Sequence, residues 1–458
     1  MKPKITAPLD QGFMPMALVC RKMREETALC GQDIVIGAER NKGYTTVYKT
    51  RIYKDNSGHD EENCGFIDRI AKSLLWVSGG YKLIIAGSSV VGEYIKKTFC
   101  HGGARDFDVR FMERVYEKEF EVILTDLEHA PVDKSSASPV GKHLDGCRIG
   151  FDAGGSDRKV SAVIDGETVY SEEVVWFPKI NPDPNYHYEG ILNAMKTAAS
   201  HMPRVDAIGV SSAGVYVDNK IMVASLFLKV SDEDFEKKVK NMYIDVAREI
   251  GENIPIEVAN DGDVTALAGA MSLNDNGILG IAMGTSEAAG YVDMDGNITG
   301  WLNELAFAPV DYNKDAMVDE WSGDYGCGVK YFSQDSVIKL APTAGIELDE
   351  SLSPAEKLKV VQGLMEQGDE RAAKIYETIG VYFGYTIAYY CEFYDIKQVL
   401  IMGRVTSGEG GVILLERAKE VLSTEFPEIA EKVKLNIPDE KARRVGQSVA
   451  AASLPKIN

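Results

Sequence analysis

An acidic residue followed by glycines is the first feature of this sequence that could perform chemistry. Asp152 lies at the end of the strand-like stretch 147–151 and precedes Gly154, Gly155 and Ser156. Glycines let a backbone approach a phosphate closely, and the N–H groups of a turn can donate to its oxygens. A carboxylate beside such a turn can hold Mg²⁺ directly or through water. A tight turn with a surface aspartate would have the same sequence, so the motif alone does not decide between the two.

Asn260 and Asp261 form a second polar pair. They follow the strand-like stretch 254–259 and precede a helix expected from about residue 263. A carboxylate at this place could accept a proton from a substrate hydroxyl, while the amide orients the same substrate. Asn and Asp are also preferred helix N-caps, and from these two residues alone the cap is the favoured interpretation.

Two glycine-containing turns could bind a nucleotide. Gly284 and Thr285 could contact phosphate, and Gly403 opens a glycine-rich loop that continues through 407–411. Such turns are common loop material, so each is a weak signal by itself.

The elements that must position these residues alternate between strands and helices from residue 147 onward, which predicts an α/β fold. Apolar residues at 235, 239, 242, 246 and 250 share one face and predict a helix that Ser231 can cap. Each polar motif follows a predicted strand, and α/β folds place ligand sites at such strand ends.

Composition narrows the functional class. The 458 residues are 45% hydrophobic and 26% charged, with a net charge of −20. Nucleic-acid affinity depends on basic surface, so no nucleic-acid partner is expected. The apolar run 378–391 is shorter than the roughly 20 residues of a membrane span, so no membrane partner is expected either. Seven scattered cysteines fit reduced thiols, which favours a cytoplasmic location.

A change in composition suggests where the chain divides. Residues 131–146 collect proline, glycine and serine and are predicted to be a linker. Residues 1–130 precede it as an N-terminal α/β domain. Their strand, strand, helix, strand order repeats that of 148–214 and suggests a degenerate duplicate without a counterpart of Asp152.

The order and spacing of these motifs resemble the ROK family of sugar kinases and sugar-responsive repressors. IGFDAGGS at 149–156 is similar to the family's IGIDLGGT, and EVANDGDVTALAGA at 257–270 is similar to VENDANAAALGE. VLIMGRV at 399–405 looks like the adenosine-side strand. The resemblance covers about residues 146–458.

This resemblance implies a two-lobed actin-like ATPase (ribonuclease H-like) fold. It places lobe 1 at 147–259 with a C-terminal helix at about 441–458, and lobe 2 at 260–440. It also implies an enzyme that uses ATP and Mg²⁺ to phosphorylate a hexose or related sugar. A homodimer is compatible with this interpretation.

The resemblance assigns roles to individual residues. Asp261 becomes the catalytic base, Asn260 and Glu304 bind the sugar, and Asp152 organises Mg²⁺. The nucleotide- and phosphate-binding set that it implies is Asp152, Gly154, Gly155, Ser156, Gly284, Thr285 and Gly403.

Departures from the family pattern lead to two expectations. Cys327 matches a family zinc ligand, but Phe307, Glu320 and Ser322 replace the other three, and one cysteine cannot make a tetrahedral zinc site. No zinc is therefore expected. Glu287 follows the second phosphate turn and is expected to bring a negative charge close to the phosphates. This charge leaves a second interpretation of the chain open: a non-catalytic sugar-binding or regulatory protein without a DNA-binding domain.

Overall fold

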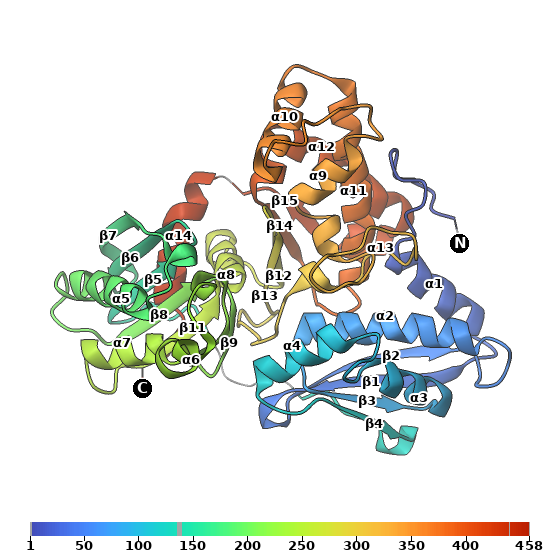
Figure 1. Ribbon diagram of the computed structural model, residues 1–458, viewed down its shortest axis with the longest axis horizontal. Helices are drawn as coiled ribbons and strands as arrows, with labels where there is room; N and C mark the ends of the chain where they lie inside the picture. Colours follow the sequence, from blue (N-terminus) through green and yellow to red (C-terminus); the bar gives the residue numbers. More distant parts are fainter. Residues whose placement is uncertain (1, 135–139, 439, 458) are drawn as a thin grey trace. The chain divides into compact units, whose positions relative to one another are not determined.

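The computed structural model describes residues 2–134, 140–438 and 440–457 (Figure 1). The chain is a mixed α/β protein that divides into two compact units, each assembled from segments far apart in the sequence. The first unit comprises Met1–Ser136, Ile281–Ala289 and Gly300–Ile437, and the second comprises Ala137–Gly280, Gly290–Thr299 and Pro438–Asn458. Residues 135–139 of the predicted linker lie outside the described residues.

The second unit is built on a five-stranded sheet. Across the sheet its strands are β11 (Ile256–Asn260), β8 (Ala207–Ser212), β5 (Cys147–Ala153), β6 (Asp157–Ile164) and β7 (Glu167–Val175). β5, β8 and β11 are parallel, and β6 and β7 are antiparallel to their neighbours. The register pairs Asp152 with Ser211 and Asn260 with Ser212. The carboxyl ends of the three parallel strands therefore meet at one edge, where α/β sheets place their ligands.

Helices cover this sheet. They are α5 (Pro184–Ala199), α7 (Met242–Ile250), α8 (Asp261–Leu273) and α14 (Glu440–Ala452), and a small sheet of β9 (Val215–Val217) and β10 (Lys220–Val223) lies beside them. A Cβ on Gly150 would lie 2.0 Å from Ser448 O, and one on Gly209 would lie 1.7 Å from Ala451 O. Only glycine at these two positions lets α14 pack so closely on β5 and β8.

The helix predicted over 235–250 is interrupted. Ser231 caps a short α6 (Asp232–Asp234) by accepting a hydrogen bond from Asp234 N at 3.2 Å, as predicted. A π-helical turn at Phe235–Val239 then precedes α7. The apolar face still packs into the core through Phe235, Val239 and Met242, because burial rather than a single helical repeat decides which face turns inward.

A second sheet, most of whose residues belong to the first unit, has its own helices. Its strands, in order, are β13 (Glu287–Val292), β12 (Ile278–Met283), β14 (Gln398–Met402) and β15 (Lys434–Asn436). The helices are α9 (Gln334–Leu340), α10 (Pro354–Glu366), α11 (Glu370–Tyr390), α12 (Glu409–Glu425) and α13 (Pro427–Ala430). No described helix, α11 included, combines the length and apolar character that a membrane crossing requires.

The N-terminal part of the first unit has a four-stranded sheet of its own. Its strands, in order, are β2 (Thr45–Ile52), β1 (Gln32–Glu39), β3 (Lys82–Ala86) and β4 (Glu121–Thr125), with α1 (Met16–Thr27), α2 (Asp60–Ser78), α3 (Ser89–Thr98) and α4 (Asp106–Tyr116). β3 is antiparallel to β1, whereas the corresponding pair β5–β8 is parallel. This difference in strand direction argues against the predicted duplication, because the order of elements along a chain does not set their direction in a sheet.

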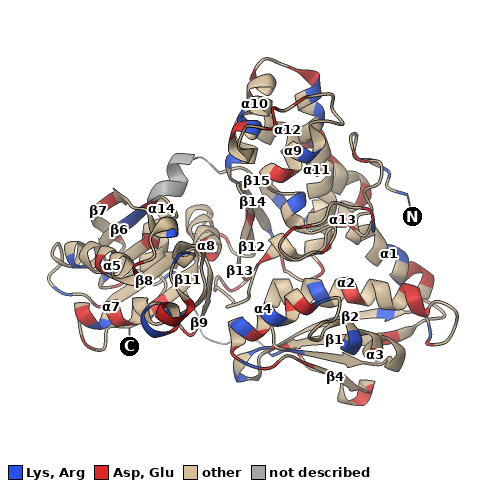
Figure 2. Cartoon of the chain, in the orientation of Figure 1, with Lys and Arg blue, Asp and Glu red and all other residues tan. Residues whose placement is uncertain are grey.

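Charges in the N-terminal part are mixed in sign. Figure 2 shows Lys and Arg positions interleaved with Asp and Glu positions on α1, α2 and α4. The absence of a nucleic-acid partner, expected from composition, stays a prediction.

The residues that precede α1 pack against α11. Tyr382 OH donates to Asp10 Oδ2 at 2.6 Å, and Tyr385 OH donates to Ile5 O at 3.0 Å. From α2, Ser73 Oγ lies 2.6 Å from Tyr389 OH. The tyrosine-rich helix is thus a core element whose polar tips meet the N-terminal part of the same unit.

Candidate functional site

The carboxyl ends of β5 and β11 bring two aspartates into electrostatic contact in the second unit. Asp152 is 7% exposed, and its Oδ1 accepts a hydrogen bond from Ser211 Oγ at 2.8 Å. Burial raises the pKa of Asp152 to about 6; the Ser211 hydrogen bond opposes this shift and repulsion from Asp261 adds to it. Two carboxylates in one desolvated place are typical of a site that binds a cation or handles a proton.

The cap function and the acidic function of the second motif belong to different residues. Asn260 caps α8, since its Oδ1 accepts from Gly262 N at 2.7 Å and its Nδ2 donates to Gly214 O at 2.7 Å. Asp261 is the first residue of the helix and is half-buried. Burial raises the pKa of Asp261, while the Gly262 N–H and Lys179 oppose the shift. A carboxylate with a raised pKa is a stronger proton acceptor than an exposed one.

The first glycine turn lies beside this pair. Trp176 Nε1 donates to Gly154 O at 2.8 Å, which anchors the turn to the end of β7. A Cβ on Gly154 would lie 2.7 Å from Asp157 O, so the tight turn needs glycine there. Gly155 and Ser156 are exposed, which leaves their backbone N–H groups open to an anion.

Lys179 is a basic residue that sequence reasoning missed. Its exposed side chain crosses the glycine turn: Nζ lies 3.0 Å from the position that a Cβ on Gly155 would take. Its charge also lowers the pKa of Asp261. No motif marks this lysine, which follows a proline in the short 3₁₀ turn Pro178–Ile180; only the fold carries it to the turn.

The second phosphate turn and Gly403 lie together in the first unit. Gly284 and Thr285 form the turn between β12 and β13, where Thr285 is exposed. A Cβ on Gly403 would lie 2.2 Å from Met283 O, so β14 ends directly against the residue that precedes the turn. Gly403 has φ 100°, a conformation that favours glycine, and it brings the glycine-rich loop close to the turn.

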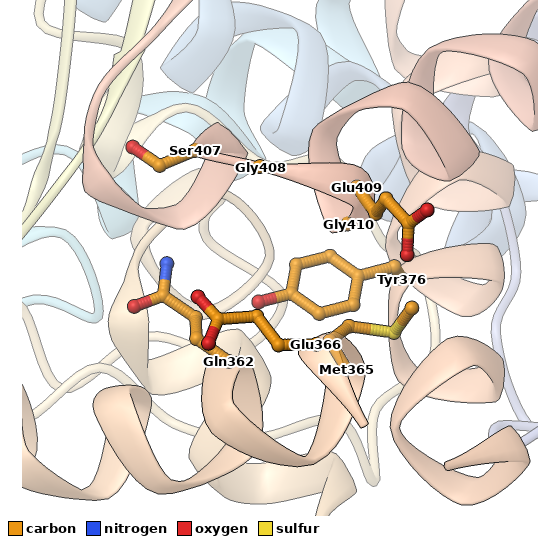
Figure 3. A pocket seen from close by; sticks show the side chains of 8 residues that line it. All are labelled: Gln362, Met365, Glu366, Tyr376, Ser407, Gly408, Glu409 and Gly410. Atoms are coloured by element: carbon orange, nitrogen blue, oxygen red, sulfur yellow. The ribbon is translucent and has the colours of Figure 1, made fainter. Parts of the chain in front are cut away.

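A pocket of about 390 Å³ opens between that loop and two helices (Figure 3). Its lining is Gln362, Met365 and Glu366 from α10, Tyr376 from α11, and Ser407, Gly408, Glu409 and Gly410. The Tyr376 side chain is fully buried, and its hydroxyl has no hydrogen-bond partner among the described residues. In Figure 3 this hydroxyl points toward Gln362 and Glu366. The sequence predicted the glycine-rich loop 407–411. It did not predict that α10 and α11 form the rest of the pocket lining.

Glu287 does not present the charge that its sequence position suggested. Its side chain is 3% exposed and lies against Gly328, where an added Cβ would be 2.3 Å from Oε2. Neither carboxylate oxygen has a hydrogen-bond partner among the described residues. Burial raises the pKa of Glu287 well above its usual range, and the neighbouring Glu304 raises it further. Burial therefore disfavours the negative charge that the sequence position suggested at the phosphate turn.

Glu304, the predicted sugar-binding acid, is half-buried beside Glu287. Its backbone N–H donates to Trp76 O at 3.0 Å, and the preceding Asn303 N–H donates to Val77 O at 2.9 Å. The C-terminal end of α2 therefore sets the backbone position of this acid.

The residues around Cys327 do not fit a zinc ion. Lys72 Nζ lies 3.8 Å from Cys327 Sγ, and a buried ammonium at this distance repels a divalent cation. Phe307 instead packs on Trp76, with ring centroids 4.5 Å apart, and Glu320 pairs with Lys330. Across the described residues, no group of three or more His, Cys, Asp or Glu could hold a metal ion.

Comparisons with known proteins agree with the motif order. The sequence model of the ROK family matches residues 148–451. A ROK hexokinase from Thermus thermophilus is 17% identical over 66% of this chain and 97% of its own, with a TM-score of 0.49. A ROK family transcriptional regulator, a homolog of the E. coli MLC protein, is 17% identical over 68% and 79%, with a TM-score of 0.50.

A ROK family glucokinase from Streptomyces griseus, solved with glucose and AMPPNP, is 18% identical over 66% of this chain and 98% of its own, with a TM-score of 0.46. No curated protein matches the sequence. At these identities the likeness concerns the fold, and residues 1–147 lie outside the family match.

Proposed function

Because the chain belongs to the ROK family, we propose that it transfers the terminal phosphoryl group of ATP to a hydroxyl of a hexose or related sugar. The fold class that the resemblance implied, an actin-like ATPase fold, is that of the family. The observation that carries the proposal is the acidic pair Asp152 and Asp261, held at the carboxyl ends of β5 and β11 with raised pKa values. Catalysis of phosphoryl transfer consists largely of positioning and charge stabilisation, which such an arrangement can supply.

In this reaction Asp261 accepts the proton of the attacking sugar hydroxyl. The hydroxyl oxygen forms a bond to the γ-phosphorus as the bond from that phosphorus to the β–γ bridging oxygen breaks, and ADP leaves. Asn260 and Glu304 orient the sugar. The turns at Gly154–Ser156 and Gly284–Thr285 donate backbone N–H groups to phosphate oxygens.

Asp152 fits a magnesium site in the chemistry of its donors. Ser211 is the hydrogen-bond donor to Oδ1, and the carboxylate is buried next to a second acid, whose repulsion a cation would relieve. Mg²⁺ prefers one or two carboxylates together with phosphate oxygens. When bound, it would offset the charge of the phosphates.

The pocket behind Ser407–Gly410 is the proposed place of the nucleoside. Gly410 allows close packing with Tyr376, since a Cβ there would lie 2.6 Å from the ring. Tyr376 lines this pocket with residues of α10 and of the glycine-rich loop. Zinc has no part in the proposal, because the buried ammonium of Lys72 lies 3.8 Å from Cys327 Sγ.

A sugar-binding protein without turnover is the second candidate. Asp152, Asp157 and Asp261 place three acidic groups around the first phosphate turn, against Lys159 and Lys179. This acidic surplus repels phosphates and favours binding without transfer.

One experiment separates the two candidates. Purified protein is given ATP, Mg²⁺ and a panel of hexoses and amino sugars; ADP release is measured by a coupled assay and sugar binding by calorimetry. Turnover of at least one sugar is expected. Sugar binding without ADP release would establish the second candidate, and neither binding nor turnover with any sugar would overturn both.

A further inference from the structure

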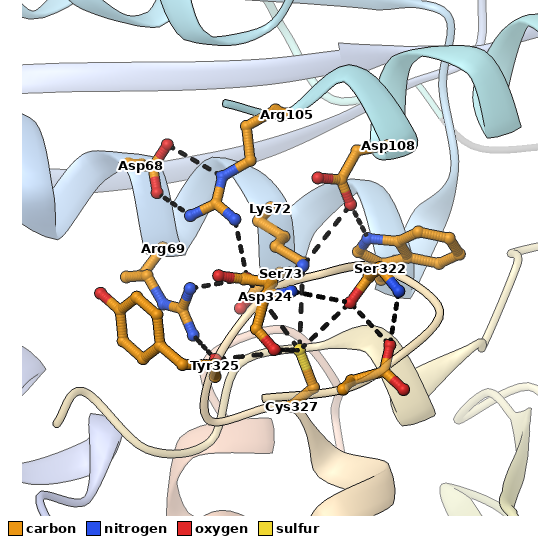
Figure 4. A network of polar contacts seen from close by, with 12 residues as sticks. Asp68, Arg69, Lys72, Ser73, Arg105, Asp108, Ser322, Asp324, Tyr325 and Cys327 are labelled. Carbon is orange, nitrogen blue, oxygen red and sulfur yellow. Dashed lines mark hydrogen bonds and ion pairs between the residues drawn. The ribbon is translucent and has the colours of Figure 1, made fainter. Parts of the chain in front are cut away.

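A buried cluster of charges joins the N-terminal domain to the loop that contains Cys327 (Figure 4). Asp324 Oδ2 accepts from Arg69 Nη1 at 2.7 Å and from Lys72 Nζ at 2.6 Å, both on α2. Arg105 Nη1, just before α4, lies 2.7 Å from the same oxygen. A single loop carboxylate thus meets three cations of the N-terminal domain.

The charges of this cluster are balanced, and its side chains are buried away from water. Asp68 pairs with Arg105, and Asp108 lies 3.6 Å from Lys72, so three acids face three bases. All six side chains are at most 8% exposed. Burial alone would raise the pKa of Asp324, but Arg69, Lys72 and Arg105 together hold it well below its usual range. Losing one partner of such a buried cluster leaves an uncompensated charge, so its geometry is strongly held.

The loop fixed by Asp324 is paired to the segment that follows Glu304. Pro309 and Cys327 form an antiparallel bridge, and Gly328 N donates to Ala308 O at 3.0 Å. The end of α2 binds the start of the same segment, through the hydrogen bonds of Asn303 and Glu304 with the carbonyls of Val77 and Trp76. One helix of the N-terminal domain therefore holds Glu304 at two points.

We infer that the N-terminal domain is a positioning element for Glu304, with Lys72 and its partners on Asp324 as the contact that sets the loop. The family resemblance would place a zinc ion at this loop, and the disagreement has a physical reason: side chains of the same chain bind the loop instead. The consequence for sugar binding rests on the proposed function, whereas the consequence for the loop does not.

The test compares Lys72→Met with Arg110→Met. Lys72→Met removes one buried charge, while Arg69 and Arg105 still pair with Asp324. Arg110 is 63% exposed in a surface ion pair on α4 and serves as the matched control. Trp76→Phe is the second variant, should Lys72→Met not fold; it keeps an aromatic ring beside Phe307 but loses the hydrogen bond from Nε1 to Asp108 Oδ1.

Hydrogen exchange of the amides of residues 303 and 304 is the first readout, since it requires no ligand. We expect exchange about tenfold faster or more in Lys72→Met, or in Trp76→Phe, and unchanged in Arg110→Met. The second readout is the KM for the sugar, expected to rise about tenfold while kcat stays within about threefold.

The outcomes distinguish this inference from the proposed function. Unchanged exchange at 303 and 304 in a folded variant overturns the inference, whether or not the wild type phosphorylates a sugar. Faster exchange with an unchanged KM for the sugar, or an unchanged Kd where there is no turnover, overturns the positioning role. Faster exchange in a protein that binds no sugar supports the hold on the loop and counts against the proposed function alone.

Discussion

Glu287 offers a test of the electrostatics of the first unit that requires no substrate. The side chain is 3% exposed and has no hydrogen-bond partner among the described residues, so we expect it to stay protonated in the folded protein at pH 7. The unfolded chain ionises the same group near pH 4.3. Since the folded pKa is raised, stability is fully present below pH 4.3 and is lost as pH rises toward the folded pKa.

The loss amounts to about 1.4 kcal/mol of unfolding free energy per pH unit, or ~2.7 kcal/mol between pH 5 and pH 7. Glu287→Gln has no proton to lose, so its unfolding free energy lacks this dependence. Relative to the wild type, the variant should therefore gain ~2.7 kcal/mol over that interval. Glu428→Gln, an exposed position in the same unit, is the control and should gain nothing.

Urea denaturation at pH 5, 6 and 7, followed by circular dichroism, measures the difference. A wild-type-to-variant difference that stays constant from pH 5 to pH 7 would refute the reasoning, because Glu287 would then be ionised in the folded state. ATP affinity is a second readout. It should hardly change in Glu287→Gln, since a neutral Glu287 places no charge beside the second phosphate turn.

The remaining site residues give three further expected outcomes. Asp261→Asn should lower kcat by about 10² to 10⁴-fold with little change in melting temperature, whereas the surface variant Asp245→Asn should match the wild type; unchanged turnover would remove Asp261 from the mechanism. Lys179→Met should lower kcat/KM for ATP about tenfold because it removes the cation over the first glycine turn, and an effect no larger than that of the exposed Lys229→Met would contradict this role. The value of kcat/KM should rise as pH increases through about 6, because the raised pKa of Asp152 keeps that group protonated below this point. A flat profile between pH 5 and pH 7.5 would show that its ionisation is not required.

The order of motifs was readable from the sequence because each motif is local. A strand ending in Asp152 and glycines, and a strand ending in Asn260 and Asp261, are short patterns whose backbone chemistry shows in the residues themselves. The cap and the acid could not be told apart in that way, since both side chains suit either role. The structure assigns the cap to Asn260 through its hydrogen bond with Gly262 N.

The orientation and burial of side chains could not be predicted from position alone. Glu287 follows a phosphate turn in the sequence, yet it turns into the core, where burial raises its pKa. Lys179 belongs to no motif, yet it crosses the glycine turn. A residue's charge state depends on the desolvation and neighbours that packing provides, and these come from distant parts of the chain.

The sequence by itself determined the family, the alternation of strands and helices after residue 147, and the loss of three zinc ligands. Only the tertiary structure decided what holds the loop of Cys327. Arg69, Lys72 and Arg105 come from a part of the chain more than 200 residues away from Asp324, as the separations of 255 and 252 residues for the first two show. No local sequence pattern predicts such ion pairs, because buried charges pair with groups that are close in space and not at a fixed spacing along the chain.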